Sequence, residues 1–264
     1  MTHTLISPAV VCHQVGRAFG TNGTSQQILT DINLEIAPGE IISIIGASGS
    51  GKSTLLRALG GLDVGFTGQV RVDDTPVAQY DSRCAIGFQE PRLMPWATVA
   101  ENVALGLPDG TSKKAASNRV AELLRLVGLD HAADHRPREI SGGMAQRASL
   151  ARAMARDPEI LLLDEPFGAL DALTRIKMQQ LLLDVHSQTG TTTVMVTHDV
   201  DEALLLSDRI ILLDDAEHAA GATITKIFTP PNPRPRASHD PALVSLREQL
   251  LTGLGVESLT SSKG

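Results

Sequence analysis

The sequence contains a glycine-rich loop between an apolar run and a helical pattern, and few folds accommodate that combination. Residues 41–45 read IISII, which has the length and continuous apolar character of a buried parallel strand. The loop 46–54 reads GASGSGKST, and a helical pattern runs from about 52 to 59. Its glycines let the backbone N–H groups curl inward, and the positive end of the helix dipole adds to the cradle they form. We therefore expect an α/β protein with an anion-binding loop at the end of a strand.

This loop also predicts a nucleotide site. It has the spacing glycine, four residues, glycine, lysine and serine that binds nucleotide phosphates. Lys52 supplies a cation for the β- and γ-phosphates, and Ser53 offers a hydroxyl to Mg²⁺. A flexible glycine turn ahead of a helix is the alternative, but it leaves the combination of strand, loop and helix unexplained. The residues predicted to contact the nucleotide here are Gly46, Ala47, Ser48, Gly49, Ser50, Gly51, Lys52, Ser53 and Thr54.

Further apolar runs predict an open sheet with two additions. Buried strands are expected at 160–163, 192–196 and 209–213, with helical patterns between them. The alternation of apolar and polar residues over 32–36 is typical of a half-buried antiparallel strand. The block from about 91 to 157 is helical in pattern and is predicted to be an inserted helical subdomain.

We expect residues 1–229 to form one nucleotide-binding domain and residues 230–264 to form an extension. The sequence PPNPRPR at 230–236 is typical of a stiff, extended linker. Asp240 followed by Pro241 predicts the start of a short helical tail.

Composition limits the partners and the surroundings. The chain of 264 residues is 42% hydrophobic with a formal net charge of −7, which argues against a duplex nucleic-acid partner. No apolar run approaches the roughly 18 residues needed to cross a bilayer, so we expect any membrane role to be peripheral. The N-terminus does not resemble a secretory signal, so we expect the cytoplasm. Cys12 and Cys84 are too few for a disulfide framework or a zinc cage and are expected to be buried or half-buried thiols.

Acidic residues end one predicted strand and a histidine ends another. Asp164 and Glu165 follow the apolar run ILLL, at the end of a strand where open α/β sheets place ligands. Asp164 suits the Mg²⁺ shell, and Glu165 can hold or deprotonate an attacking water, although a solvated acidic turn is the alternative. His198 closes the run TTTVMV; it could serve the reaction or merely cap the turn into the helix beginning near Asp199.

A second anion site is indicated by ISGGMAQR at 140–147. Ser141 can N-cap a helix that runs to about Arg156. Gly142 and Gly143 would expose backbone N–H groups at its start. Taken alone, this element could equally be a capped surface helix.

With this element the sequence resembles the nucleotide-binding subunits of ABC transporters, from Phe19 to about Leu250. The resemblance implies a P-loop NTPase fold with a RecA-like, mostly parallel sheet, an antiparallel β subdomain and an inserted helical subdomain. It implies that the element at Ser141 completes the ATP site of an opposite copy, in a head-to-tail dimer that encloses two nucleotides. Ile140 and Met144 replace the family's usual Leu and Gln, and neither change removes an anion-binding group.

The resemblance also assigns roles to single residues. Phe19 matches the aromatic that stacks on adenine, although a core phenylalanine is the alternative. Gln89 matches the glutamine that touches Mg²⁺ or water and links the site to the helical subdomain. Asp171 matches the aspartate of the loop that crosses the dimer interface, and His198 matches the histidine that senses the γ-phosphate. Glu165 resembles the catalytic base, and the implied metal contacts are Ser53, Gln89 and Asp164.

Three segments narrow the resemblance to the nitrate/sulfonate/taurine importer group, and within it especially to aliphatic sulfonate importers. They are QEPRLMPWATVAENV, DEPFGALDALTR and PRPRASHDPALVSLREQLL. The implied function is ATP hydrolysis coupled to uptake of a small anionic solute, with taurine and nitrate as alternatives to sulfonate. The implied partners are a second copy of the chain, two transmembrane permease subunits and, through the permease, an extracytoplasmic solute-binding protein. The implied location is the cytoplasmic face of the inner membrane.

Three other classes of function fit less well. A soluble ABC ATPase acting on DNA or the ribosome would carry a coiled-coil insertion or two cassettes, whereas this chain has one cassette and no heptads. A P-loop kinase for small molecules would leave SGGMAQR unexplained. A regulator that binds ATP without hydrolysing it is separated from an ATPase by a phosphate-release assay.

Overall fold

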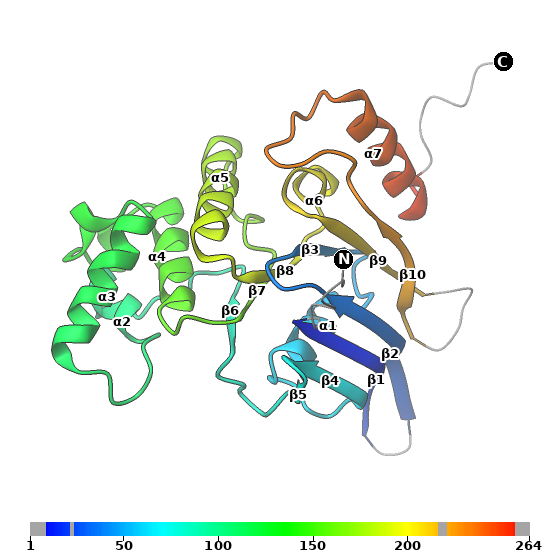
Figure 1. The fold of residues 1–264 in the computed structure, drawn as a ribbon, viewed down its shortest axis with the longest axis horizontal. Helices are drawn as coiled ribbons and strands as arrows, with labels where there is room; N and C mark the ends of the chain where they lie inside the picture. Colours follow the sequence, from blue (N-terminus) through cyan, green and yellow to red (C-terminus); the bar gives the residue numbers. More distant parts are fainter. Residues whose placement is uncertain (1–8, 22–23, 216–220, 257–264) are drawn as a thin grey trace, which may run out of the picture.

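Two β-sheets and a block of helices form the chain (Figure 1). The computed structural model describes residues 9–21, 24–215 and 221–256. The larger sheet has the strand order β10-β9-β3-β8-β7-β6, and the smaller has the order β2-β1-β4-β5. The strands are β1 (Val10–Thr21), β2 (Thr24–Ile36), β3 (Ile41–Ile45), β4 (Thr67–Val72), β5 (Thr75–Pro76), β6 (Cys84–Gly87), β7 (Ile160–Asp164), β8 (Thr192–Val196), β9 (Arg209–Asp214) and β10 (Thr223–Phe228). The helices are α1 (Lys52–Leu59), α2 (Val99–Ala104), α3 (Lys113–Leu126), η1 (Asp130–Ala132), η2 (Pro137–Glu139), α4 (Gly142–Met154), α5 (Ala172–Thr189), α6 (Val200–Leu206) and α7 (Pro241–Gly253).

The larger sheet is parallel except for β10, which pairs antiparallel to β9 at one edge. Every residue of β3 and of β8 is buried, because helices cover both faces of a parallel sheet. This explains why these strands are continuous apolar runs with no alternation. The predicted strands and the helix over 52–59 are confirmed.

The smaller sheet is antiparallel throughout. Ile32, Leu34 and Ile36 of β2 are buried while Asn33 and Glu35 are exposed, so the predicted alternating strand is confirmed. The inner face of this sheet and α1 share one hydrophobic core with β3. The smaller sheet is thereby held next to the glycine-rich loop.

The helical block lies at the β6 end of the larger sheet and contains α2, α3 and α4 (Figure 1). Val120, Leu123 and Leu124 of α3 are buried in a second core, which they share with Ala148 and Ala151 of α4. The predicted apolar stripe therefore packs inside this block. Helix α4 ends at Met154, two residues before the expected end.

The C-terminal segment lies against α6. Helix α7 begins at Pro241, and the side chain of Asp240 caps it by accepting a hydrogen bond from the N–H of Ala242 (2.9 Å), as expected. Leu243 and Leu250 are buried in a third core together with residues of α6. Two arginines of the proline-rich segment, Arg234 and Arg236, donate hydrogen bonds to carbonyls at the end of α6. The division of the chain into a domain 1–229 and a tail 230–264 remains a prediction.

Both cysteines are buried and free, as expected. Within the described ranges, no helix is long and apolar enough to span a membrane. Residues 1–8, on which the expectation about a secretory signal depends, and the last eight residues of the tail lie outside the described residues.

Candidate active site

The glycine-rich loop closes around the side chain of Lys52. The Lys52 ammonium donates to the carbonyl oxygens of Gly46 (2.9 Å) and Ala47 (2.7 Å). Burial lowers the pKa of Lys52, and the nearby charges of Glu165 and Asp164 partly counter this effect. Gly51 has φ 86°, a conformation in the left-handed region that favours glycine. The loop therefore has the inward curl that phosphate binding requires.

Gly46 is required for a different reason, namely crowding. A Cβ at this position would lie 2.1 Å from the carbonyl oxygen of Leu213 on β9 and 2.8 Å from Ser50 Oγ. Among the described residues, Ser50 Oγ is one of the buried side-chain atoms with no hydrogen-bond partner. An unsatisfied hydroxyl beside a phosphate loop is available for a ligand oxygen.

One pocket joins most of the predicted site residues. Phe19 lies in it with 45% of its surface exposed, so the alternative of a core phenylalanine is wrong. Glu165 and His198 line the same pocket as the phosphate loop. The residues that line it are Phe19, Ile28, Gly46, Ser48, Gly49, Gly51, Lys52, Ser53, Thr54, Glu165 and His198.

Ser53 and Asp164 meet at the edge of this pocket. Ser53, in the first turn of α1, donates from its hydroxyl to Asp164 Oδ1 at the end of β7 (2.9 Å). Hydroxyl and carboxylate oxygens are the ligands that Mg²⁺ prefers. Within the part of the chain that the structure describes, no group of three His, Cys, Asp or Glu side chains could hold a metal ion. The pair therefore fits a Mg²⁺ ion that takes further ligands from phosphate oxygens.

Glu165 and His198 face one another. Glu165 Oε2 lies 3.3 Å from His198 Nδ1, and their side chains are 29% and 65% exposed. Glu165 has φ 47°, a left-handed conformation that is uncommon for a non-glycine residue and often marks a functional position. Its N–H donates to the carbonyl of Val196 (2.9 Å), which holds this turn against β8. The cap of α6 is Asp199, so the alternative role of His198 as a cap is wrong.

A partly buried ionic cluster lies next to this pair, and the sequence did not predict it. Arg175 of α5 lies 3.3 Å from Asp199 (Nη1 to Oδ2) and 3.6 Å from Glu202 (Nε to Oε1). Thr197 donates from its hydroxyl to Glu202 Oε2 (2.7 Å). Burial raises the pKa of Glu202, whose side chain is only 5% exposed. The one available signal was an acidic residue within the otherwise apolar run EALLL.

Gln89 and Asp171 lie outside the pocket lining. Gln89 is exposed. A Cβ built on Gly168 would lie 3.2 Å from Gln89 Nε2 and 3.5 Å from Glu165 Oε2. These distances bring Gln89 and Glu165 to the same glycine. Asp171 is exposed and caps α5, where its carboxylate accepts the N–H of Thr174 (3.0 Å), and that hydrogen bond lowers its pKa.

The second predicted anion site is at the start of α4, in the helical block and apart from α1 (Figure 1). Ser141 Oγ accepts the N–H of Met144 (3.3 Å), so the predicted N-cap is confirmed. Ser141 and Gly142 are exposed, and a Cβ on Gly142 would have no atom within 4 Å. Gly143 is half-buried, and a Cβ there would lie 2.5 Å from Thr174 Cγ2. This helix start therefore points to open space and does not line the pocket of its own chain.

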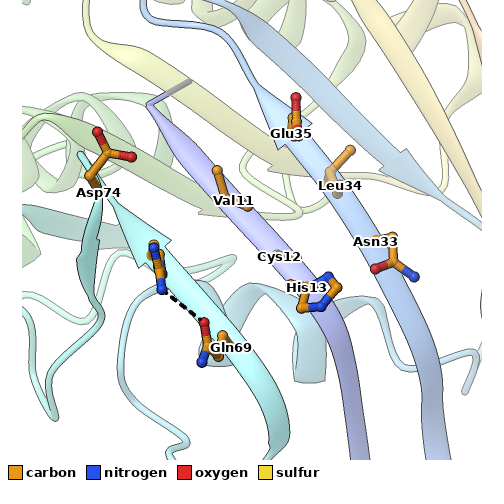
Figure 2. A pocket seen from close by; sticks show the side chains of 9 residues that line it. Val11, Cys12, His13, Asn33, Leu34, Glu35, Gln69 and Asp74 are labelled. Atoms are coloured by element: carbon orange, nitrogen blue, oxygen red, sulfur yellow. Dashed lines mark hydrogen bonds between the residues drawn. The ribbon is translucent and has the colours of Figure 1, made fainter. Parts of the chain in front are cut away.

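Another hollow lies on the outer face of the smaller sheet, over β1, β2 and β4 (Figure 2). His13, Asn33, Glu35 and Gln69 are among the side chains that line it. It contains neither a glycine-rich loop nor the start of a helix, so it is not a candidate for the phosphate site.

Comparison with known families decides which of the functional classes applies. A sequence model described as ABC transporter matches residues 29–168, which is more than half of the chain. The chain belongs to the ABC transporter family. This ABC chain is 49% identical to the aliphatic sulfonates import ATP-binding protein SsuB of Granulibacter bethesdensis, over 97% of each protein. It is 46% identical to the aliphatic sulfonates import ATP-binding protein SsuB 1 of Xanthomonas axonopodis pv. citri, over 94% of this chain and 97% of that protein.

Solved structures agree with this family. The ABC chain matches the dimeric, post-hydrolysis state of the ATP-binding cassette MJ0796 bound to ADP and Pi with a TM-score of 0.71 and 34% identity, over 84% of this chain and 99% of that chain. A further structure of MJ0796, described as a dimeric bacterial ABC transporter cassette, matches equally well. The expected P-loop cassette fold is therefore confirmed. The chain is an ATP-binding ATPase of the ABC type, as expected.

Proposed function

We propose that this chain is the ATP-hydrolysing subunit of an importer for small organic anions, most closely aliphatic sulfonates. The observation that carries the hydrolytic function is one pocket lined by the phosphate loop, Phe19, Glu165 and His198. The solute is supported by the names of the two curated relatives, which match nearly the whole chain. Taurine and nitrate are the alternative solutes of the same machinery.

In the proposed mechanism, residues of the loop hold the triphosphate. The inward N–H groups and Lys52 bind the β- and γ-phosphates, while Phe19 stacks on the adenine. Ser53, Asp164 and Gln89 would hold Mg²⁺, which when bound offsets the negative charge that develops on the phosphates.

Glu165 is the proposed general base. Its half-buried carboxylate can accept a proton from an attacking water, and the neighbouring His198 can contact the γ-phosphate while orienting Glu165. Phosphoryl transfer depends mainly on positioning and on stabilising charge, so small movements of this pair should switch turnover on and off.

A second copy of the chain would complete the site. The exposed start of α4, with Ser141, Gly142 and Gly143, offers N–H groups to an anion outside its own chain. Asp171 is exposed at the start of α5 and would cross the same interface. The dimeric state of the related cassette MJ0796 supports this arrangement.

The remaining proposed partners are two permease subunits at the cytoplasmic face of the inner membrane and, through them, an extracytoplasmic solute-binding protein. The segment at Gln89 and the helical block would pass the closure of the dimer to the permease. A groove between this block and the larger sheet supports the proposal, because Tyr80 and Leu105 line it with 69% and 59% of their surfaces exposed. Exposed apolar groups gathered in a groove are typical of a contact surface.

The substitution Glu165→Gln tests the hydrolytic role. It should leave ATP affinity within about twofold and lower turnover by about 10²–10⁴, which is the range for a lost general base. Phosphate release and calorimetric ATP binding measure the two quantities. Glu35→Gln, at an exposed position on the outer face of the smaller sheet, is the matched control. Normal hydrolysis by the Glu165→Gln protein would refute the assignment.

The solute needs a separate experiment. The chain, its permease and the solute-binding protein would be reconstituted in liposomes, and ATP turnover would be measured with an alkanesulfonate, taurine or nitrate. We expect the alkanesulfonate to stimulate turnover most. A larger stimulation by nitrate would overturn the solute and leave the ATPase assignment standing.

A further inference from the structure

The aromatic ring in the nucleotide pocket is backed by an arginine that no motif predicts. Arg17 and Phe19 are two residues apart on β1. The centre of the Arg17 guanidinium is 4.0 Å from the centroid of the Phe19 ring. A cation at this distance over a ring is attracted to its negative face.

The guanidinium is itself held in place on several sides. Arg17 Nε donates to Asp63 Oδ2 (2.7 Å), and Nη1 donates to the carbonyl of Ala18 (2.8 Å). The side chains of Arg17 and Asp63 are only 19% and 16% exposed. Burial tends to raise the pKa of Asp63, but hydrogen bonds from Arg17 and from the N–H of Gly65 bring the pKa below its usual value. The carboxylate is therefore charged at neutral pH and paired with Arg17.

A side chain at residue 65 would crowd the Arg17 guanidinium in its present position. A Cβ on Gly65 would lie 2.9 Å from Arg17 Cζ and 2.9 Å from Nη2. Gly65 also donates its N–H to Asp63 Oδ1 (2.9 Å), so the same short loop orients the carboxylate.

Asp63 connects this arrangement to the phosphate loop. The N–H groups of Leu62 and Asp63 donate to the carbonyl of Arg57 in the last turn of α1, at 2.9 and 3.2 Å. Helix α1 begins at Lys52, in the loop that holds the phosphates. A chain of contacts therefore runs from the phosphate loop through α1, Asp63 and Arg17 to the Phe19 ring.

The position of the arginine relative to the pocket defines its role. Among the described residues, Phe19 lines the nucleotide pocket and Arg17 does not. The guanidinium lies over one face of the ring, so we expect a flat ligand to stack on the other face. An exposed phenylalanine would otherwise lose rotamer freedom whenever a base stacks on it.

We propose that Arg17 is a positioning residue that holds Phe19 ready for the adenine and fixes this platform relative to the phosphate loop through Asp63. The inference rests on the proposed role of Phe19. It predicts that Arg17 contributes to binding of the base and makes no contribution to binding of the phosphates.

The test compares two ligands in full-length protein carrying Glu165→Gln, so that ATP is not consumed. Calorimetry with Mg²⁺ present gives the dissociation constants of ATP and of inorganic tripolyphosphate, which lacks the base. Arg17→Met should raise the ATP constant about threefold, as expected for a lost cation–π contact. Phe19→Ala should raise it about tenfold, as expected for a lost base stack. Both variants should bind tripolyphosphate as the parent does.

Two further variants separate positioning from general stability. Asp63→Asn should raise the ATP dissociation constant about as much as Arg17→Met does. The double variant should bind ATP no more weakly than the single variant with the larger dissociation constant, because both residues act through Phe19. Arg71→Met removes an exposed arginine of the same sheet that donates to Gln69 (3.1 Å), and it should change neither constant. In the wild-type Glu165 background, Arg17→Met should raise KM for ATP and leave kcat unchanged.

Each possible outcome either supports or overturns the proposed role of Arg17. If Phe19→Ala leaves the ATP constant unchanged, the proposed adenine contact fails and the role of Arg17 fails with it. If Phe19→Ala weakens ATP binding while Arg17→Met has no effect, only the inference about Arg17 is overturned. If Arg17→Met weakens the binding of ATP and of tripolyphosphate equally, the substitution damages the whole site, and the inference about Arg17 is again overturned.

Discussion

Replacing Arg175 by methionine tests how the fold keeps the buried carboxylate of Glu202 next to Glu165 and His198. Methionine keeps most of the length and apolar contact of the arginine but removes its charge. The change leaves Glu202, 5% exposed, without the cation 3.6 Å from its Oε1. It also removes the ion pair with Asp199.

The loss of stability should be moderate. Breaking a fully buried ion pair costs about 3–5 kcal/mol. Arg175 is 33% exposed, however, and its Nε is too far from Glu202 for a hydrogen bond, so solvent screens part of the interaction. Thr197 still donates to the carboxylate after the change. We therefore expect a decrease of about 1–2 kcal/mol in the free energy of unfolding at pH 8.

The decrease should depend on pH in a defined direction. Burial raises the pKa of Glu202, and the hydrogen bond from Thr197 partly counters this effect. The charge of Asp199 raises the pKa further, whereas the charges of Arg175 and His198 lower it. A raised folded-state pKa means that the neutral acid favours folding. This contribution is complete below the unfolded value near 4.5 and is lost as the pH rises through the folded value. Without Arg175 the pKa of Glu202 in the folded protein rises further. At a pH where Glu202 is ionised, each additional pKa unit lowers the free energy of unfolding of the variant by about 1.4 kcal/mol.

Urea unfolding at pH 5 and pH 8 measures this effect. Arg175→Met should lose clearly more stability at pH 8 than at pH 5, and adding Glu202→Gln should recover most of the difference. Arg138→Met is the control, because the Arg138 side chain is 74% exposed and pairs with the exposed Glu139, so its loss should cost less than 1 kcal/mol at either pH. Equal losses at both pH values, with no recovery in the double variant, would refute the reasoning.

Two other substitutions test the surroundings of the site. Gly46→Ala places a Cβ 2.1 Å from the carbonyl of Leu213, so the loop must shift, and we expect calorimetry to show at least a roughly tenfold weaker binding of ATP. Unchanged affinity would mean that the loop tolerates the shift. Arg236→Met removes hydrogen bonds to the carbonyls of Leu204 (3.0 Å) and Ser207 (2.7 Å) at the end of α6, and we expect thermal unfolding to show a loss of about 1–3 kcal/mol. An unaltered midpoint would mean that the proline-rich segment does not secure α6.

The parts of the site that could be predicted from the sequence are those whose residues are contiguous. The phosphate loop folds from nine consecutive residues, and its glycines, lysine and serine have fixed tasks relative to the following helix. The larger sheet could be predicted for a similar reason, since each buried strand is a short apolar run with its own boundaries. Asp164 and Glu165 could be placed at the ligand edge of the sheet because they follow such a strand directly.

The parts that escaped prediction depend on contacts between distant residues. Arg17 meets Asp63 across 46 positions, and Arg175 meets Asp199 across 24. An arginine on a strand or helix reads from the sequence as a solvated charge, and only the folded chain shows that its guanidinium is enclosed. The crowding around Gly46 by Leu213 escaped for the same reason. The sequence of the proline-rich segment predicts a stiff linker, whereas in the structure Arg234 and Arg236 donate hydrogen bonds to carbonyls at the end of α6.

The distribution of exposed donors argues for a site shared between two chains. Within one chain, Lys52 is directed at the carbonyls of its own loop and is 8% exposed. Ser141 satisfies only one N–H at the start of α4, whereas an α-helix begins with four N–H groups that lack partners within the helix. The nearby Gly142 has open space in front of it, so this positive helix end is accessible to a ligand from outside its own chain. In the proposed dimer, the γ-phosphate of the nucleotide bound to a second copy would satisfy the N–H groups of this helix start, so we expect closure of the pair to depend on the nucleotide.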